Sequence, residues 1–411
     1  MDNISEKVDD LINKCNKCGF CQANCLVYKT TFNEFHAARG RVQLVKKLLD
    51  GIVEIDDDYE KILNSCLLCK ECTLSCPSGV DPPEIIRSSR ITLFERKFFP
   101  STKNVIIKTL ANSKWRERSF YLAGFMKNTL IDKQNIFTSY KNINIKSINI
   151  DKKSFIGQIK KKKLSPLKKS KTAFFVGCFI NHTLTDTGHN ILKIFKSNNI
   201  DLVVPYDQQC CGTPSYVYGD IKTTKDLAKK NISVFDSFDT IITACATCGS
   251  MLKSEYNKLF GDDPDLSDKA KKFSKKIYDF SEFLVKYTNP AFKNQNVSGC
   301  TVTYHDGCHM SRYQAVTEEP RILLKKTFNN NYVELEEADR CCGAAGLFQL
   351  YNADIAKNIS ARKIENIENS GADIVAVSCP ACLFRIQGYI DFANLNKKVV
   401  HIADLIAKNY E

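Results

Sequence analysis

The sequence predicts an α/β protein in which a helical amino-terminal region precedes two copies of an α/β unit. Two short cysteine runs with identical spacing stand near the amino terminus, and helical patterns surround them. Further along, short β-rich runs that end at cysteines alternate with helical stretches, and this whole pattern occurs twice. Strand, crossover helix, strand is the order that builds parallel sheets, so each copy is expected to form one such sheet.

Composition narrows the class of protein further. The chain has 411 residues, 43% of them hydrophobic, which excludes wholesale disorder. Its longest stretch without a charged residue, 172–185, covers 14 positions, whereas a membrane-spanning helix needs about 18. The first ten residues include Asp2, Glu6, Asp9 and Asp10, where a secretory signal would be basic and then apolar. We therefore expect no transmembrane helix and a cytoplasmic protein, with peripheral contact at the inner face of the membrane as a variant.

Cysteine usage indicates metal ligation. Of the 19 cysteines, 8 fall in the two amino-terminal runs and 10 in two later sets of five, which leaves Cys300 unassigned. Such clustering is typical of metal sites, and the cysteine fraction is too low for a small disulfide scaffold. The formal net charge of +13 counts every cysteine as a neutral thiol, so anionic clusters would offset part of it.

Part of the basic excess is local. Residues 160–171 contain seven lysines around Pro166, which is the composition of a solvated linker. A nucleic-acid site would need aromatic or arginine residues between the lysines, and this run has none. A linker is favoured, nucleic acid is not expected as a partner, and an acidic partner or a membrane surface is the alternative.

The two amino-terminal runs read CNKCGFCQANC from Cys15 and CLLCKECTLSCP from Cys66. Both have the spacing C-x2-C-x2-C-x3-C, which is typical of two-cluster ferredoxins, where the fourth cysteine of each run binds the other cluster. Structural zinc is the alternative, but it uses four ligands in total, and eight are present. We therefore predict two 4Fe–4S clusters that lie close together, the first held by Cys15, Cys18, Cys21 and Cys76, the second by Cys25, Cys66, Cys69 and Cys72.

Helices are expected around these runs. A helical pattern covers residues 35–49 and ends before Gly51. After the second run, Asp81 is placed to cap a helix that begins with Pro82. We thus expect a helical ferredoxin-type domain at residues 1–100. Within it, Arg39 and Arg41 either bring positive charge to a cluster or occupy solvated helix positions.

The later cysteines form an internal repeat. Each copy has a lone cysteine, then a Cys-Cys-Gly (CCG) triplet 32 or 33 positions on, then a C-x-x-C motif 35 or 38 positions after the first cysteine of the pair. The repeat predicts a connecting helical and basic region at 101–171, copy 1 at 172–298 and copy 2 at 299–411. The ligand candidates are Cys178, Cys210, Cys211, Cys245 and Cys248 in copy 1, and Cys308, Cys341, Cys342, Cys379 and Cys382 in copy 2.

Each cysteine group follows a short β-rich run, at residues 172–178, 200–211, 240–245, 301–308, 332–342 and 373–379. Helical stretches at 190–196, 224–235 and 355–367 separate these runs. Because sites in parallel sheets form beyond the carboxyl ends of the strands, the five cysteines of each copy are expected to converge. Five thiols suit a larger, non-cubane iron–sulfur cluster, or a cubane with one free thiol. A vicinal disulfide and zinc are the alternatives.

At this point the sequence resembles a known family, the iron–sulfur subunits of glycolate- and lactate-oxidising complexes, which are related to heterodisulfide reductase subunits with the CCG cysteine-rich domain. The resemblance is carried by CNKCGFCQANC, CLLCKECTLSCPSGV, CCGTPSYVYGD, YHDGCH, EADRCCGAAG and SCPAC. It implies the two ferredoxin-type clusters, one or two further iron–sulfur clusters at the CCG sites, and a separate FAD-linked subunit that oxidises the 2-hydroxy acid. Two positions depart from the family pattern: Gly307 replaces a proline, and Cys245 is present where many glycolate oxidase subunits lack it.

Function follows as an expectation. Neither G-x-G-x-x-G nor G-x-x-x-x-G-K-[ST] occurs, so no flavin or nucleotide site is expected on this chain, and no catalytic residue is assigned. We expect an electron-transfer subunit that passes electrons from a flavoprotein to a quinone or another acceptor. The alternatives are reduction of a disulfide at a CCG site and a structural module that uses iron as a staple.

A few charged and imidazole side chains beside the CCG cysteines are further candidates. His305 and His309 flank Cys308 and are candidate proton donors or ligands, although imidazoles at strand ends often only bond backbone groups. Structural roles are expected for Asp306, Asp339 and Arg340.

Overall fold

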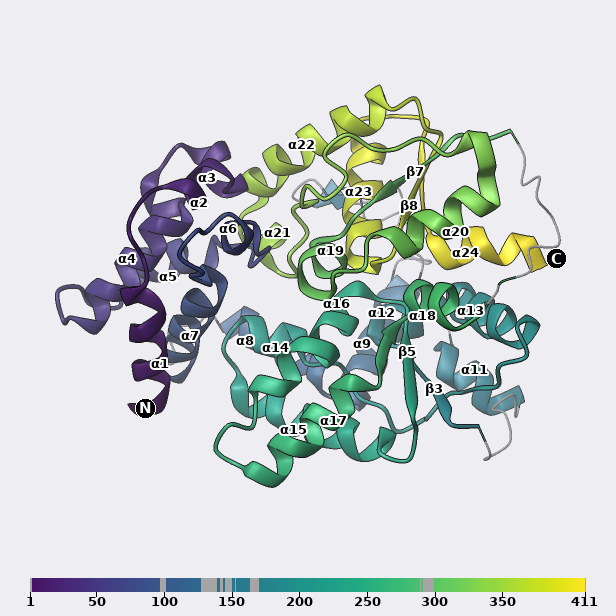
Figure 1. Cartoon of the computed structure of the whole chain (residues 1–411), viewed down its shortest axis with the longest axis horizontal. Coiled ribbons are helices and arrows are strands. Elements are labelled where there is room, and N and C mark those ends of the chain that lie inside the picture. The colour runs from purple at the N-terminus through teal and green to yellow at the C-terminus, as the bar shows by residue number, and fades with distance from the viewer. Residues whose placement is uncertain are drawn as a thin grey trace.

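The computed structural model describes residues 2–96, 101–126, 139–140, 143–144, 150–151, 153–162, 170–288, 290 and 299–410. Figure 1 shows a helical body at the amino terminus, in purple, beside two α/β units, the teal copy 1 and the green-to-yellow copy 2. This arrangement confirms the predicted fold class. Among the described residues, no helix combines the length and the apolarity needed to cross a membrane.

The amino-terminal body consists of helices joined by the two cysteine loops. These elements are α1 (Asp2–Asn13), α2 (Phe20–Ala23), α3 (Leu26–Thr31), the 3₁₀ turn η1 (Glu34–His36), α4 (Ala38–Leu49), α5 (Asp57–Asn64), α6 (Glu71–Leu74) and α7 (Pro82–Glu95). The helix expected over residues 35–49 begins only at Ala38, because the 3₁₀ turn precedes it. Asp81 is the residue before α7, but its side chain does not cap the helix. It accepts a hydrogen bond from the Thr73 hydroxyl at 2.8 Å, which ties α7 to the second cysteine loop.

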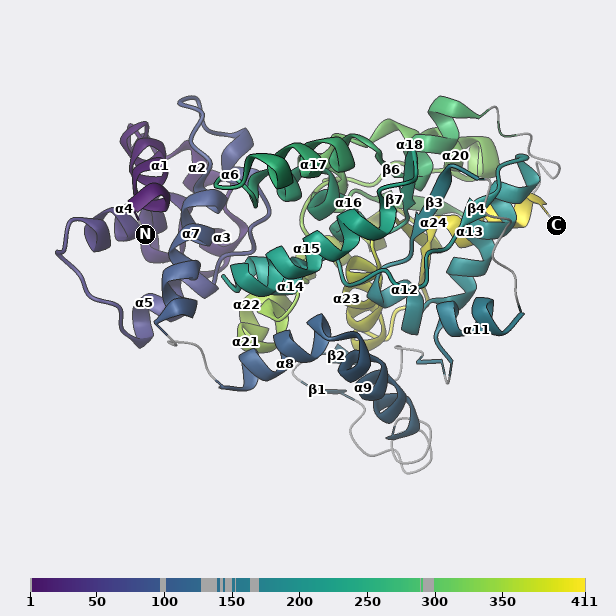
Figure 2. The ribbon, with the colours of Figure 1, turned by 90° about the horizontal axis from the view of Figure 1, so that it is seen from below.

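The connecting region contains α8 (Ser101–Ala111), α9 (Ser113–Met126), the short strands β1 (Ser139–Tyr140) and β2 (Ile143–Asn144), and α11 (Phe155–Lys162). Figure 2 shows α8 and α9 running along one side of the molecule, beneath α14 and α15. The predicted linker at 160–171 falls partly on α11, and its residues 163–169 lie outside the described part of the chain.

Copy 1 is built on a four-stranded parallel sheet with the order β4-β3-β5-β6. Its strands are β3 (Thr172–Phe175), β4 (Leu202–Val203), β5 (Thr240–Thr243) and β6 (Ile277–Asp279). Its helical elements are α12 (Cys178–His182), α13 (Thr185–Ser197), α14 (Thr213–Val217), α15 (Ile221–Phe235), α16 (Ala246–Ser250), the π-helical turn η4 (Met251–Glu255), η5 (Tyr256–Lys258), α17 (Pro264–Lys275) and α18 (Phe280–Tyr287). The predicted helices at 190–196 and 224–235 lie within α13 and α15.

Copy 2 has a three-stranded parallel sheet, β7-β8-β9, formed by Val302–His305, Ile374–Val377 and Lys398–His401. Its helical elements are α19 (Cys308–Gln314), α20 (Glu318–Phe328), η6 (Asn329–Asn331), α21 (Phe348–Tyr351), α22 (Ala353–Asn369), α23 (Pro380–Phe392), α24 (Ile402–Ala407) and η7 (Lys408–Tyr410). The helix predicted at 355–367 lies within α22.

One β-rich run of copy 2 does not become a strand. Residues 332–342 pair with the sheet only through a single bridge between Val302 and Tyr332. Glu337 has a φ of 47°, which is incompatible with an extended strand. The carbonyl of Glu336 accepts instead from the Asn366 amide, at 3.0 Å. The strand expected here is therefore wrong, because α22 takes the backbone partners that a neighbouring strand would have used.

The two copies are packed face to face. Helix α16 of copy 1 contacts α19 of copy 2, and α12 of copy 1 contacts α23 of copy 2. One hydrophobic core spans both sheets and includes Phe174 and Val176 from copy 1 with Tyr304 and Ile402 from copy 2. This shared core holds the carboxyl ends of the two sheets toward each other.

Candidate metal centres

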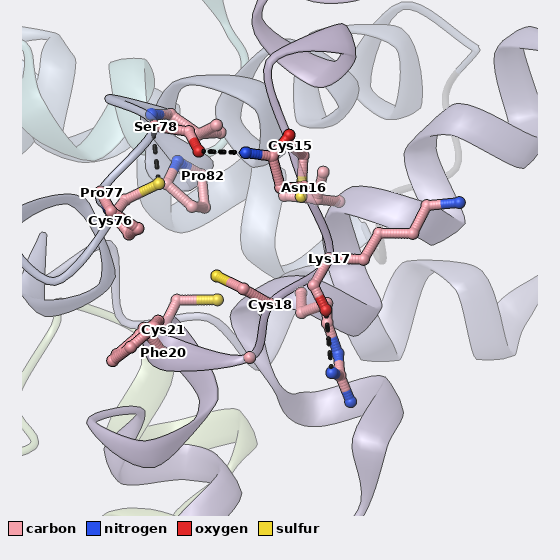
Figure 3. Close-up of a pocket in the computed structure, with 14 residues that line it drawn as sticks. Cys15, Asn16, Lys17, Cys18, Phe20, Cys21, Cys76, Pro77, Ser78 and Pro82 are labelled. Atoms are coloured by element: carbon pink, nitrogen blue, oxygen red, sulfur yellow. Dashed lines mark hydrogen bonds between the residues drawn. The ribbon is translucent and has the colours of Figure 1, made fainter.

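Four cysteines of the amino-terminal body surround one small space, as Figure 3 shows for Cys15, Cys18, Cys21 and Cys76. Gly19, with a φ of 90°, is the left-handed residue that lets α2 begin between Cys18 and Cys21. The backbone N–H of Val80 donates to Sγ of Cys76 at 3.3 Å. Burial, together with the neighbouring cysteines, raises the pKa of the Cys21 thiol to about 11. A bound metal cation would reverse this effect and hold the sulfurs as thiolates.

The other four cysteines of this body form an adjacent group. Cys72 lies close to Cys69, Cys66 and Cys25, and also to Cys21 of the first group. Burial raises the pKa of Cys69 to about 12. The N–H of Leu68 donates to Sγ of Cys66 at 3.4 Å. The two groups have the composition expected for crossed ligation, and the assignment of ligands remains a prediction.

Crossed ligation can be tested by single cysteine removal. We expect Cys76→Ala to abolish the same EPR signal as Cys18→Ala, and Cys25→Ala to abolish the other amino-terminal signal, each with a loss of about four iron atoms per chain. Alanine is chosen because a serine oxygen can replace a thiolate as a ligand. If Cys76→Ala removed the signal that Cys69→Ala removes, the ligation would not be crossed.

Arg39 and Arg41, both on α4, differ in burial. Arg41 is 1% exposed and donates to the carbonyls of Ile62 and Ser65, both at 3.0 Å, which fixes the chain that leads into Cys66. Arg39 is partly exposed and pairs with Glu34 at 2.8 Å while contacting the Lys17 carbonyl at 3.3 Å. Of the two roles left open for these arginines, a solvated helix position is therefore wrong for Arg41.

The five cysteines of copy 1 converge beyond the ends of β3, β4 and β5. Their side chains form a row in which each thiol is hydrogen-bonded to the next, in the order Cys178, Cys210, Cys211, Cys248 and Cys245. Hydrogen bonds from Cys178 and Cys211 lower the pKa of Cys210. Gly212 has a φ of 89° and directs its N–H to Sγ of Cys210 at 3.5 Å.

Copy 2 repeats this row in the same order. Each thiol is hydrogen-bonded to the next, in the order Cys308, Cys341, Cys342, Cys382 and Cys379. The Sγ atoms of Cys342 and Cys382 are 3.4 Å apart. Hydrogen bonds from Cys341 and Cys382 lower the pKa of Cys342. The sequence repeat is thus a repeat of side-chain arrangement.

The two rows touch. Cys245 of copy 1 is hydrogen-bonded to Cys379 of copy 2, and the Thr247 hydroxyl lies 3.3 Å from Sγ of Cys379. The N–H of Ala246 donates to the Ser378 carbonyl at 3.1 Å, which fixes this contact through the backbone. All ten cysteines, together with Cys66, line one cavity of about 470 Å³.

The second amino-terminal group adjoins copy 2. Cys69 lies close to Cys308 and Cys341, and Cys25 and Cys69 pack with both in one apolar cluster. Arg312 donates to the Cys69 carbonyl at 3.3 Å, and the Tyr313 hydroxyl donates to the Leu68 carbonyl at 2.7 Å. Helix α19 thereby fixes the second cysteine loop against the start of the copy 2 row.

The other candidates have mainly structural partners. Asp306 pairs with Arg321 at 2.6 Å, Asp339 with Arg312 at 3.2 Å, and Arg340 with Glu337 at 3.3 Å. His309 forms a 2.6 Å hydrogen bond through Nδ1 with the Ser250 hydroxyl and stacks on Tyr313. Burial lowers the pKa of His305 to about 3, so its ring is neutral. Cys300 belongs to neither row.

Some residues near the sulfurs carry no sequence signal. Lys363 is fully buried, and its Nζ donates to the Ala338 carbonyl at 3.1 Å. The ammonium group is close enough to Cys342 to interact with it electrostatically. Burial lowers the pKa of Lys363 to about 8. No local sequence pattern marks Lys363 or Arg312, because only the packing of α22 and α19 places them near cysteines.

The donor chemistry fits iron–sulfur clusters. Every cysteine is a free thiol, so the vicinal pairs do not form disulfides. Sets of cysteine thiols with backbone N–H groups directed at the sulfurs are typical of iron–sulfur ligation, whereas structural zinc closes with four donors. The ten thiols in the two linked rows are more than the four donors that a structural zinc site uses.

Comparisons with known proteins agree with this geometry. The 4Fe–4S dicluster domain family matches residues 11–80, and the cysteine-rich domain family (CCG) matches residues 172–253 and 302–387. A probable glycolate oxidase iron–sulfur subunit of Bacillus subtilis is 30% identical over 98% of this chain and 95% of that protein. The chain belongs to this family of CCG-containing iron–sulfur subunits. It is an iron–sulfur protein of electron transfer and carries several clusters.

Other relatives of this iron–sulfur protein differ in their named activities. One of the subunits of the fumarate reductase (CoM/CoB) of Methanothermobacter marburgensis is 27% identical over 96% of this chain and 72% of that protein. Lactate utilization protein A of Lysinibacillus sphaericus is 33% identical over 54% of this chain and 96% of that protein. The family is therefore shared by proteins with different substrates, and the substrate has to be argued separately.

Proposed function

We propose that this chain is the electron-transfer subunit of a complex that oxidises a 2-hydroxy acid, glycolate or lactate. In this proposal an FAD-linked partner subunit oxidises the acid, and the chain passes the electrons to a quinone or another acceptor. Iron–sulfur clusters supply the one-electron carriers. The observation that carries the proposal is that the four cysteine groups lie near one another in an unbroken series.

The ligand groups follow one another in a fixed order. Cys21 of the first group lies near Cys72 of the second, Cys69 of the second lies near Cys308 and Cys341 of copy 2, and Cys379 of copy 2 meets Cys245 of copy 1. Cys18 is exposed, which puts the first group at the surface where a partner can dock. We therefore assign entry to the first group and exit to the CCG cavity.

The ligand sets and domains are assigned within this proposal. The ferredoxin-type domain spans residues 1–100, the connecting region 101–171, copy 1 172–298 and copy 2 299–411. The flavin partner is supported by the name of the glycolate oxidase relative and by the lack of a nucleotide motif in this chain. A quinone acceptor would place the complex at the inner face of the membrane, with the chain itself in the cytoplasm.

Reconstitution tests this function. Anaerobically purified holoprotein is mixed with glycolate or lactate, with and without the FAD-linked subunit, and cluster reduction is followed by EPR after rapid freezing. We expect no reduction without the flavin subunit, and with it reduction of the amino-terminal clusters before the CCG centres. Substrate turnover by the chain alone, or reduction of the CCG centres first, would contradict the proposal.

A second candidate is favoured by the shared cavity. Both CCG rows line the same space of about 470 Å³, which is large enough for a small disulfide. Under this candidate the holoprotein would reduce a disulfide with an artificial electron donor, and Cys341→Ser or Cys342→Ser would abolish the reaction. Absence of disulfide reduction by the holoprotein, with cluster content intact, would eliminate it.

A further inference from the structure

His305 presents an unpaired nitrogen inside copy 2. It is the last residue of β7, is fully buried, and stands three positions before Cys308. Its Nδ1 lies 3.2 Å from the carbonyl oxygen of Ala338. A carbonyl can only accept, so Nδ1 carries the proton and Nε2 carries a lone pair. Nε2 has no hydrogen-bond partner among the described residues.

His305 lies beside the row of copy 2 thiols. A ring nitrogen of His305 and the Sγ atoms of Cys342 and Cys382 all lie within 4.8 Å of one another. A lone pair beside thiolate sulfurs is unfavourable, and a buried polar atom left unpaired costs about 1–3 kcal/mol. A metal ion between these three atoms removes both penalties. Donor atoms on one tetrahedral ion lie roughly 3.3–3.8 Å apart, and the sulfurs are already separated by 3.4 Å.

We propose that Nε2 of His305 is a ligand of the iron–sulfur cluster bound by copy 2, beside Cys342 and Cys382. This inference rests on the assignment of the copy 2 cysteines as a cluster site. It makes His305 a sixth protein donor of that set.

The surroundings of His305 suit a ligand. The Ala338 carbonyl that fixes its tautomer also accepts from the Asp306 N–H at 3.0 Å and from Nζ of Lys363 at 3.1 Å. Metal-bound histidines commonly donate their other N–H to a backbone carbonyl, which sets the ring orientation. The buried Lys363 adds positive charge on the same side, beside Cys342.

Copy 1 lacks this nitrogen. The equivalent position, three residues before Cys178, is Phe175, which is fully buried and packs on Phe235. The two CCG centres are therefore chemically different, although their cysteine rows match. Imidazole ligation raises the reduction potential of an iron–sulfur centre, because a neutral donor stabilises the reduced state relative to thiolates alone. The copy 2 centre is thus expected to be easier to reduce than it would be with cysteine alone.

Pulsed EPR on the wild-type holoprotein tests whether a histidine nitrogen is bound to the copy 2 cluster. Protein with ¹⁵N-labelled histidine is compared with unlabelled protein, and the signal studied is the one lost in Cys342→Ala. We expect a nitrogen coupling of the size of a direct ligand, which changes with the isotope. If iron is present in copy 2 but that signal shows no strongly coupled nitrogen, the proposal is wrong while the proposed function stands. If Cys342→Ala loses no iron, the assignment of the copy 2 cysteines as a cluster site is wrong, and the ligand proposal fails with it.

Variants supply the second readout. His305→Phe, which copies the residue of copy 1, should lose the nitrogen coupling and shift the reduction equilibrium of the copy 2 centre at least tenfold toward the oxidised form, which is 59 mV for one electron. The matched control is His401→Phe. His401 is equally buried, but its Nε2 bonds the Ala244 carbonyl at 2.8 Å and its Nδ1 accepts from Ala403 at 3.2 Å. Its loss should leave coupling and potential unchanged, and equal shifts in both variants would overturn the ligand role.

Discussion

Arg90→Met is expected to lower the free energy of unfolding by about 3–6 kcal/mol, because several backbone carbonyls would lose a charged donor, each loss being worth roughly 1–3 kcal/mol. Arg90 is 2% exposed and lies on α7. Its guanidinium donates to the carbonyls of Leu63 at 2.7 Å, Cys66 at 2.8 Å and Val217 at 3.0 Å. One side chain thus joins the second cysteine loop to copy 1.

Anaerobic urea titration, followed by far-UV circular dichroism and cluster absorbance, measures this effect. Arg96→Met is the matched control, since Arg96 is exposed at the end of the same helix and its replacement should change stability by less than about 0.5 kcal/mol. Arg90→Met should also release the Cys66 loop, so cluster absorbance is expected to disappear at a lower urea concentration than helicity. Equal midpoints for the two variants would show that the carbonyl contacts of Arg90 do not stabilise the fold.

The spacing of the cysteines predicted much of the fold, for a physical reason. A cysteine that ends a buried parallel strand must lie at the carboxyl edge of the sheet, so Cys178, Cys245, Cys308 and Cys379 mark the ends of β3, β5, β7 and β8. At residues 332–342, however, the predicted strand does not form. Its composition is β-rich, but its backbone groups are satisfied by α22, and no local pattern reports a partner 30 residues away.

The relation between the sites could not be predicted from the sequence. That Cys245 meets Cys379, and that Cys69 adjoins copy 2, depends on how the surfaces of finished units fit together. From the sequence, His305 is a candidate ligand or a candidate proton donor, and nothing in the pattern decides between the two roles. The choice needs the position of the Ala338 carbonyl, which fixes the tautomer, and the positions of Cys342 and Cys382 beside the ring.

Gly219→Ala tests the same junction between the amino-terminal body and copy 1 from its other side. Gly219 has a φ of 90°, and an added Cβ would lie 2.3 Å from the carbonyl oxygen of Arg90 and 2.8 Å from Cα of Ile91. We expect a loss of about 2–5 kcal/mol, from roughly 1–2 kcal/mol of left-handed backbone strain and 1–3 kcal/mol of overpacking. The same urea titration measures it.

Gly51→Ala separates the two contributions. Gly51 has a φ of 71°, but an added Cβ would meet no described atom within 4 Å, so only the backbone strain of about 1–2 kcal/mol should appear. The excess loss in Gly219→Ala is then the steric part. Arg90 donates to the Val217 carbonyl in the turn that contains Gly219, so Arg90→Met and Gly219→Ala disturb the same contact. The double variant Arg90→Met/Gly219→Ala should therefore lose less free energy of unfolding than the two single variants together. Additivity within about 0.5 kcal/mol would show that the two contacts act independently.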